Sequence, residues 1–226
     1  MNFNKIKLAI HALLLTNYYG FKLKKINDSQ EKKRIRLEYA QRLLKTLKIS
    51  VDVKGKEKLA SGKQYLILSN HRGVIDPLIV ELALTQTDIF GLWIAKKELY
   101  NSPFFGVFVR NAGAILLDRE QSQMSGFFSE IKAEVKKGNS IFIFPEGTRN
   151  KSEASLIEFK EGFRIIALKN RLPILPVYIR THTHTALGDS LSKKNIEKTI
   201  TIEIGDLIDY KEKGNIQEIY QQMFKI

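Results

Sequence analysis

Short apolar segments alternate with amphipathic ones along most of the chain after residue 64. Six of them are rich in β-branched and other large apolar residues and have the length of buried strands: residues 65–68, 90–94, 114–117, 141–144, 174–179 and 199–204. Five longer segments have apolar residues at helical spacing: 77–85, 103–110, 121–137, 160–170 and 215–224. Strands that alternate with helices are typical of an α/β fold, so we predict one domain with a mostly parallel central sheet flanked by helices.

The first fifty residues follow a different pattern. Residues 3–19 predict a very apolar helix, whose run from 8 to 15 is far shorter than the roughly 20 residues that cross a bilayer. A second helix has its apolar residues on one face and its basic residues largely elsewhere: Leu37, Ala40, Leu43, Leu44 and Leu47 against Lys33, Arg36, Arg42, Lys45 and Lys48. We therefore divide the chain into a basic amphipathic helical anchor at 1–50 and an α/β domain at 51–226.

Positive charge is concentrated in the same N-terminal region. The net charge of the chain is +13, and residues 1–50 hold twelve Lys or Arg against three acidic residues, a net of +9. Such a concentration attracts a polyanion, either a nucleic acid or an anionic membrane. The apolar helix faces favour a membrane surface, and no nucleic-acid-binding motif accompanies the charge. The alternative is that both helices pack on the core and expose a solvated basic face.

Composition limits the possible chemistry. A chain of 226 residues that is 43% hydrophobic can form one core of good size. There is no cysteine, which excludes disulfides, thiolate metal sites and a cysteine nucleophile. His182 and His184 alternate in a Thr-His-Thr-His-Thr segment, which we interpret as a polar strand end rather than a metal site.

Two polar motifs follow directly after two of the predicted strands. The first runs Asn70-His71-Arg72-Gly73-Val74-Ile75-Asp76-Pro77, and the second runs Phe144-Pro145-Glu146-Gly147-Thr148-Arg149. Since ligands gather beyond the carboxyl ends of strands in open α/β sheets, we expect both loops at one rim. A histidine with a carboxylate partner can act as a base, and an arginine in a turn can bind an anion. The pair suits acyl transfer to the hydroxyl of a phosphorylated acceptor.

Each residue also has a simpler interpretation when taken alone. Asp76 followed by Pro77 is what a helix N-cap with proline at the first helical position looks like. The Glu146-Gly147 pair is compatible with an ordinary turn, and Arg149 with a surface cation. The two motifs in combination, each behind a strand, favour a functional site.

Further blocks between and after these motifs complete a family pattern. In order, the chain has Ala95-Lys96-Lys97-Glu98-Leu99, Pro103-Phe104-Phe105-Gly106, Gly113-Ala114-Ile115-Leu116-Leu117-Asp118-Arg119, Phe159-Lys160-Glu161-Gly162 and Leu172-Pro173-Ile174-Leu175-Pro176-Val177. Over roughly residues 64–180 the chain resembles the glycerolipid acyltransferase family, which includes the lysophosphatidate acyltransferases. Gly73 and Asn150 stand where this family commonly has serine.

The resemblance implies a reaction and a mechanism. A fatty acyl group would move from an acyl thioester, carried by acyl carrier protein or coenzyme A, to the sn-2 hydroxyl of 1-acylglycerol-3-phosphate, which gives phosphatidate. His71 would act as the general base and Asp76 would orient it. No acyl-enzyme is required, since the chain lacks both cysteine and a GxSxG serine. We expect no cofactor and no metal ion.

The family blocks also imply the residues that contact the acceptor. They are Lys96, Lys97, Arg119, Glu146, Gly147, Thr148 and Arg149. Cationic side chains would bind the acceptor phosphate, and backbone N–H groups near Gly147 would stabilise the tetrahedral oxyanion. A different lysolipid acceptor, or a catalytically silent membrane-binding protein that keeps the fold, remains an alternative. In either case we expect a peripheral or monotopic protein at the cytoplasmic face of the cell membrane.

Overall fold

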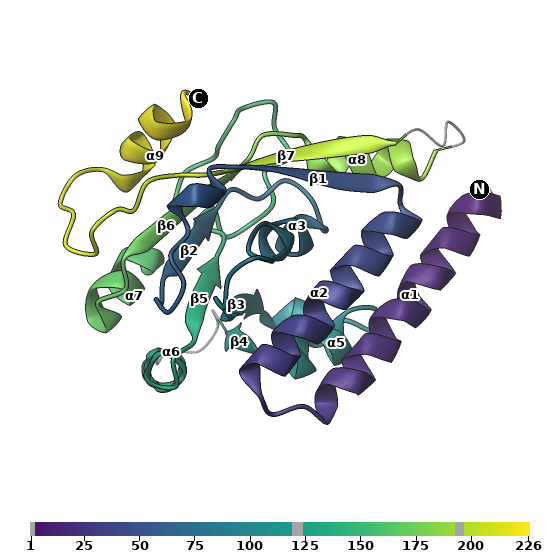
Figure 1. The fold of residues 1–226 in the computed structure, drawn as a ribbon, viewed down its shortest axis with the longest axis horizontal. Helices are drawn as coiled ribbons and strands as arrows, with labels where there is room; N and C mark the ends of the chain where they lie inside the picture. The colour runs from purple at the N-terminus through teal and green to yellow at the C-terminus, as the bar shows by residue number, and fades with distance from the viewer. Residues whose placement is uncertain (1–2, 119–123, 193–196) are drawn as a thin grey trace.

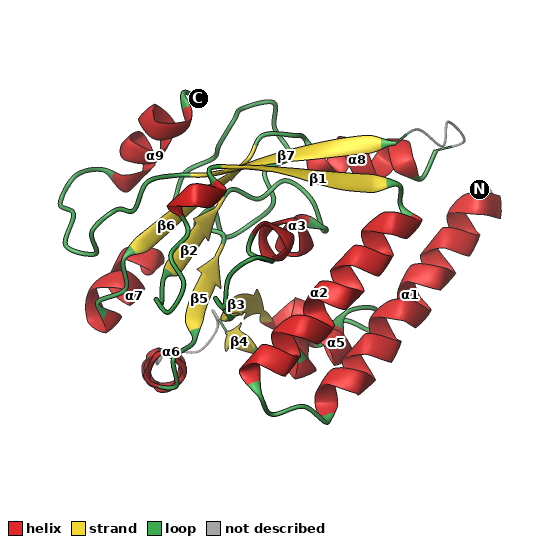
Figure 2. Cartoon of the chain, in the orientation of Figure 1, coloured by secondary structure: helices red, strands yellow, loops and turns green. Residues whose placement is uncertain are grey.

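The computed structural model describes residues 3–118, 124–192 and 197–226, which form a seven-stranded sheet covered by helices on both faces (Figures 1 and 2). The strands are β1 (Ile49–Lys54), β2 (Leu66–Ser69), β3 (Gly91–Lys96), β4 (Ala114–Leu117), β5 (Ser140–Ile143), β6 (Ile174–Ile179) and β7 (Lys198–Ile204). The α-helices are α1 (Phe3–Lys24), α2 (Ser29–Thr46), α3 (Asp76–Ala83), α4 (Lys97–Tyr100), α5 (Gly106–Asn111), α6 (Ser125–Lys136), α7 (Gly162–Asn170), α8 (Thr183–Ser190) and α9 (Ile216–Phe224).

The sheet brings the carboxyl ends of five strands to one rim. Its order is β1-β7-β6-β2-β5-β3-β4, and the strands from β6 to β4 are all parallel. β7 runs antiparallel to β6 and parallel to β1, so these two strands run in the opposite direction. The prediction of a single α/β domain with a mostly parallel sheet is confirmed. The loops after β2 and β5, which carry the two polar motifs, are neighbours because these strands pair directly.

Two apolar cores lie on the two faces of the sheet. In β2 the side chain of Ile67 joins the core that α1, α2 and α3 cover, while Leu66 and Leu68 join the core under α6, α7 and α9. All four residues of β2 are buried, which explains why the sequence shows a continuous apolar run there rather than an alternating one. Both faces of the central strands are therefore fixed before the rim loops begin.

Apart from shifts at their ends, the predicted elements agree with the structure except at four places. The short helix α4 was not predicted. The edge strand β1 was not predicted, although Ile49, Val51 and Val53 alternate with polar residues in the way that marks a half-buried strand. The interpretation of residues 181–185 as a polar strand end was wrong, because α8 begins at Thr183. The helix predicted at 121–137 is observed as Ser125–Lys136, and residues 121–123 lie outside the described part of the chain.

The second N-terminal helix packs on the sheet more deeply than its basic pattern suggested. Its apolar face, including Ile35 and Leu44, belongs to the same core as α3. Arg36, which the sequence pattern placed away from the apolar face, is 2% exposed and pairs with Glu81 of α3 at 2.5 Å. The same guanidinium donates to the carbonyl oxygens of Gly91 and Ala112, so this buried charge is fully paired.

The first helix docks on the outside of this layer. At Gly20 of α1 an added Cβ would lie only 2.8 Å from the backbone nitrogen of Phe108, so glycine permits the close approach of α1 to α5. The Asn111 side chain donates to the carbonyl oxygen of Gly20 at the same crossing. No helix among the described residues is long and apolar enough to span a bilayer.

Candidate active site

The first motif begins where β2 ends. There the side chain of Asn70 replaces the backbone hydrogen bonds between β2 and β6. The side chain of Asn70 donates from Nδ2 to the carbonyl oxygen of Ile179 and accepts the N–H of the same residue, at 3.0 and 2.7 Å. Asn70 is 1% exposed. This two-way bond ties the start of the loop to the end of β6, so the position of the next residue, His71, is fixed by two strands.

His71 and Asp76 form a hydrogen-bonded pair in this loop. Nδ1 of His71 lies 2.8 Å from Oδ2 of Asp76, whose side chain is completely buried. Oδ2 also accepts the backbone N–H groups of Arg72 and Gly73, at 2.6 and 2.7 Å. A carboxylate with this set of donors acts purely as an acceptor, so Nδ1 of His71 carries the proton. The lone pair is therefore on Nε2, where a general base needs it.

Asp76 does not serve as a helix cap. The N-cap position of α3 is Ile75, and Asp76 is the first helical residue, with Pro77 following it. Its carboxylate points back to the N–H groups of the preceding loop rather than forward into the helix. As the first residue of α3, Asp76 instead presents its carboxylate to the imidazole of His71.

Aromatic rings fix the plane of the imidazole. The ring of Phe144 stacks on His71 with centroids 3.9 Å apart and an interplanar angle of 8°. On its other side Phe144 stacks on Trp93 of β3, with centroids 4.7 Å apart. The side chain of His71 remains 17% exposed. The imidazole is thus held by a stack of Phe144, which directly follows β5, and Trp93 of β3, and part of its surface stays exposed.

Glu146 of the second motif and Asn150, which directly follows that motif, hydrogen-bond to the backbone of His71. Oε1 of Glu146 accepts the N–H of His71 at 2.7 Å, and the N–H of Asn150 donates to the His71 carbonyl oxygen, also at 2.7 Å. The side chain of Asn150 closes its own turn by donating to Ala154 and accepting from Ser152. The two motifs predicted to lie side by side are therefore interlocked at the backbone of the candidate base.

Glu146 is a buried group with two backbone donors. It is 2% exposed, and its second oxygen accepts the N–H of Ile157 at 3.2 Å. Burial raises the pKa of Glu146 from its ordinary value of 4.5 to about 7, and the two backbone hydrogen bonds oppose that rise. The sequence assigned this residue to the acceptor. In the structure its carboxylate oxygens connect the loop of His71 to the segment around Ile157.

The end of the second motif faces solvent. Gly147 has a φ of 64°, which glycine adopts readily, and its N–H donates to Phe144 within the turn. That N–H is therefore already used, and the suggested oxyanion donor at Gly147 itself is not supported. Thr148 and Arg149 are exposed. Arg149 forms no ion pair with any other residue in the described ranges, so its guanidinium can bind an external anion.

The remaining predicted cations come from the neighbouring strand ends. Lys96 is the last residue of β3 and is partly buried. Lys97 pairs with Asp118 at 3.0 Å, directly after β4. Arg119 lies outside the described residues. Because β3 and β5 pair in parallel, these lysines share the rim of the two motifs.

Besides Asn70 and Asn150, Arg72 and Thr183 hold the loop and were not predicted from the sequence. Arg72 is 5% exposed and donates to the carbonyl oxygens of Ala154 and Ser155. Thr183 is completely buried and donates to Oδ1 of Asp76 at 2.5 Å. Arg72 was visible as a cation beside the histidine, but nothing in the sequence links Thr183 to a residue 107 positions earlier.

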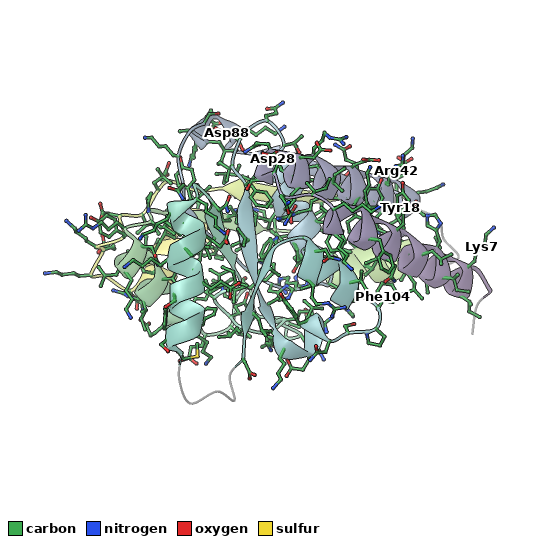
Figure 3. The ribbon with its side chains drawn as sticks, turned by 90° about the horizontal axis from the view of Figure 1, so that it is seen from below. Lys7, Tyr18, Asp28, Arg42, Asp88 and Phe104 are labelled. Carbon is green, nitrogen blue, oxygen red and sulfur yellow. The ribbon has the colours of Figure 1, made fainter. Side chains whose placement is uncertain are left out.

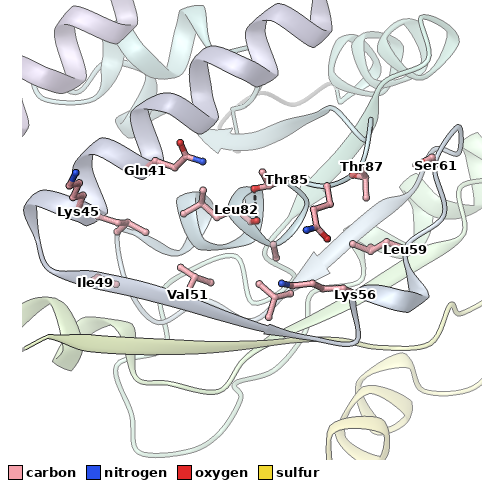
Figure 4. A pocket seen from close by; sticks show the side chains of 14 residues that line it. Gln41, Lys45, Ile49, Val51, Lys56, Leu59, Ser61, Leu82, Thr85 and Thr87 are labelled. Atoms are coloured by element: carbon pink, nitrogen blue, oxygen red, sulfur yellow. Dashed lines mark hydrogen bonds between the residues drawn. The ribbon is translucent and has the colours of Figure 1, made fainter.

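A groove elsewhere on the molecule is lined by residues outside both motifs. It has a volume of about 590 Å³ and lies between α2, α3 and β1, with Leu82 and Val51 among its apolar residues and Gln41 and Lys45 at its edge (Figure 4). Across the described ranges, no three His, Asp or Glu side chains are grouped as ligands for a metal ion. The candidate site is therefore the rim carrying the His71/Asp76 pair.

Known proteins match the region of this chain that carries both motifs. The family model described as Acyltransferase matches residues 50–180. The 1-acyl-sn-glycerol-3-phosphate acyltransferase of Helicobacter pylori is 39% identical over 117 residues, which cover 50% of this chain and 47% of that protein. The enzyme of the same name from Bacillus subtilis is 29% identical over 161 residues, 71% of this chain and 76% of that protein. The chain thus spans about half the length of the first of these relatives and more of the second.

A solved structure has the same fold over nearly the whole chain. The crystal structure of the 1-acyl-sn-glycerophosphate acyltransferase PlsC from Thermotoga maritima superposes with a TM-score of 0.67. The match covers 98% of this chain and 93% of that one, at 20% sequence identity. It therefore includes the two N-terminal helices, which lie outside the region of the family model.

Proposed function

This chain belongs to the acyltransferase family, and we propose that it transfers a fatty acyl group from an acyl thioester to the sn-2 hydroxyl of 1-acylglycerol-3-phosphate, which gives phosphatidate. The observation that carries the proposal is that both the ring and the backbone of His71 are fixed by hydrogen bonds. Asp76 fixes its ring tautomer, while Glu146 and Asn150 fix its backbone. A protein that only binds membranes needs neither arrangement.

The reaction follows from the position of the free ring nitrogen. Nε2 of His71 takes the proton of the acceptor hydroxyl as its oxygen attacks the carbonyl carbon of the thioester. Asp76 stabilises the imidazolium that forms and does not itself take the proton. The tetrahedral intermediate then expels the thiolate, which receives the proton from the imidazolium. The products are a new ester and a free thiol, with no acyl-enzyme.

The acceptor phosphate needs cations at the same rim. Arg149 is the first candidate, because it is exposed beside the loop and forms no ion pair within the described part of the chain. Lys96 and Lys97 extend the positive charge toward β3, and we keep Arg119 and Thr148 as acceptor contacts on the basis of the family pattern. Phosphate bound on this side would leave the sn-2 hydroxyl facing the imidazole.

An acyl-transfer assay tests the proposal. The purified full chain is given lysophosphatidate, lysophosphatidylcholine or glycerol 3-phosphate as acceptor, and acyl carrier protein or coenzyme A thioesters as donor. We expect lysophosphatidate to be acylated and His71→Ala to lower turnover by about 100-fold or more, since general base catalysis contributes 10²–10⁴-fold. The matched control is His184→Ala, which removes an exposed histidine of α8.

The outcomes separate the alternatives. Transfer to lysophosphatidylcholine alone would change the acceptor but keep the chemistry. A His71→Ala variant that retains more than about a tenth of the turnover would remove His71 from the role of base. No transfer with any acceptor would favour the silent membrane-binding protein.

We also propose that α1 rests on an anionic membrane surface. Four large apolar side chains on one stripe of α1 are more than half exposed: Ile10, Leu14, Tyr18 and Phe21. Figure 3 shows Lys7 and Tyr18 along this helix and Arg42 on the neighbouring α2. An apolar stripe next to exposed basic residues is the pattern of a helix that lies in the headgroup layer. The cytoplasmic leaflet is the surface we favour, because its negative potential attracts such segments.

A further inference from the structure

Thr183 reaches the candidate catalytic pair from the opposite side of β2 to the second motif. It is the first residue of α8, which follows β6. Its hydroxyl donates to Oδ1 of Asp76 at 2.5 Å, and no other described residue donates to that oxygen. Oδ2 carries the bonds to His71 and to the loop. Thr183 therefore holds the half of the carboxylate that the loop leaves free.

The hydroxyl of Thr183 is not used for its own helix. Threonine at a helix start commonly caps the first turn with its side chain. Here the N-cap residue is His182, with no side-chain cap, and the Thr183 hydroxyl points to Asp76 instead. A purely local role for this threonine does not explain that orientation.

Gly73 leaves the space that the threonine occupies. A Cβ on Gly73 would lie 2.5 Å from the hydroxyl oxygen of Thr183 and 3.0 Å from its Cβ. The φ of Gly73 is not in the left-handed region, so its glycine is required by this close approach and not by backbone conformation. The hydroxyl donor thus comes from α8, across the gap that a side chain at position 73 would fill.

The segment before α8 is attached to the loop at a second point. Nη1 of Arg72 lies 3.1 Å from Nδ1 of His182. A guanidinium can only donate, so Nδ1 of His182 is the acceptor. Immediately upstream, the Thr181 hydroxyl accepts the N–H of Thr201 in β7. Thr181 and His182, directly before Thr183, therefore connect β7 to the loop of His71.

We propose that Thr183 is a positioning residue for the acyl transfer, acting through Asp76 on the orientation of His71. The proposal rests on the proposed function. With donors on both oxygens, the Asp76 carboxylate cannot rotate, so Oδ2 stays aligned with Nδ1–H of His71 and Nε2 keeps its direction. Thr183 is completely buried, so it has no surface to offer to either substrate. Its loss should therefore lower kcat and leave both KM values unchanged.

The primary test is a set of substitutions at this position. Thr183→Val keeps the shape and removes the hydroxyl, while Thr183→Ser keeps the hydroxyl. We expect kcat to fall roughly 10- to 100-fold in the valine variant, the range for a hydrogen bond to a charged group, and to stay within about threefold in the serine variant. Thr185→Val is the matched control, because Thr185 is exposed on the same helix. A valine variant with wild-type kcat, or one in which only KM changes, overturns the proposal.

Moving the hydroxyl across the gap gives a second test. Thr183→Ala removes the oxygen that blocks a side chain at position 73, and Gly73→Ser then brings in a hydroxyl on a Cβ that lies 2.5 Å from the position of the missing oxygen. The Cβ of residue 183, which lies 3.0 Å from the new Cβ, has to shift by a few tenths of an ångström. We expect the double variant to be at least about fivefold more active than Thr183→Ala, while Gly73→Ser alone is impaired by the clash. This test also decides the question if the valine variant does not fold. A double variant no more active than Thr183→Ala overturns the proposal.

Wild type and His71→Ala in the same assay separate this proposal from the proposed function. If wild type does not acylate lysophosphatidate, or if His71→Ala retains its turnover, the proposed function fails. If both behave as expected and the Thr183 variants do not, the function stands and the positioning role alone is refuted.

Discussion

Glu146 is expected to make the stability of this protein depend on pH. Burial raises the pKa of Glu146 to about 7 in the folded chain, from an ordinary value of 4.5. The folded state therefore prefers the neutral carboxyl, so the fold loses stability as the pH rises from 4.5 through 7. Each unit of pKa difference corresponds to about 1.4 kcal/mol. Between pH 5 and pH 8 the loss from this one group is about 2–3 kcal/mol.

Glu146→Gln isolates that contribution from the other titrating groups. The amide cannot ionise, so the cost of burying a charge at pH 8 disappears. Its nitrogen cannot accept a hydrogen bond, which leaves either the His71 or the Ile157 N–H unpaired at a cost of about 1–3 kcal/mol. The variant should therefore be close to wild type in stability at pH 8 and less stable than wild type at pH 5.

Urea denaturation at the two pH values measures this difference. Trp93 is the single tryptophan and stacks on Phe144, so its fluorescence reports on the packing at the site. The free energy of unfolding of Glu146→Gln relative to wild type should change by about 2–3 kcal/mol between pH 5 and pH 8. Glu153→Gln makes the same chemical change at an exposed position of the same loop and is the control. A relative stability that is equal at both pH values, to within about 0.5 kcal/mol, would refute the reasoning.

Two further predictions concern the ligands of the rim and of α1. Arg149→Lys should raise the acceptor KM several-fold while the donor KM stays constant, because a point charge does not replace a two-pronged guanidinium. Steady-state kinetics with lysophosphatidate measures both KM values. A change confined to the donor KM would place the phosphate at the lysines of β3 and α4 instead. Leu14→Asp combined with Phe21→Asp should reduce sedimentation with anionic vesicles by more than high salt alone does, since both the apolar and the charge terms contribute. Leu168→Asp, at a similarly exposed leucine of α7, is the control for the added charge. If this control loses as much vesicle sedimentation as the α1 variant, α1 is not the membrane contact.

Much of the fold was predictable from the sequence because its signals are local. A continuous apolar run such as Tyr65–Leu68 reflects a strand covered on both faces, and that pattern does not depend on which helices cover it. The pair of His71 and Asp76 was predictable for the same reason, since five residues at a helix start bring the two side chains together. The alternation that marks β1 was equally visible and was overlooked.

Tertiary structure decided what the buried polar groups do. Arg36 has the sequence context of a solvated helix face, yet Glu81 and two carbonyl oxygens make its burial possible. Glu146 belongs to a motif typical of ligand contact, yet its carboxylate accepts the backbone N–H of His71, 75 positions away. A buried polar group must find a partner wherever the fold supplies one, and sequence spacing does not limit that choice.

The sequence by itself therefore determined the layers, the strand ends and the candidate base. It could not determine which residues hold that base, because Thr183 and Asp76 meet only when β6 pairs with β2. Periodicity records which face of an element is buried, whereas a hydrogen bond between distant residues depends on strand order and register. The hydrogen bonds that fix the position of His71 therefore form only in the assembled sheet.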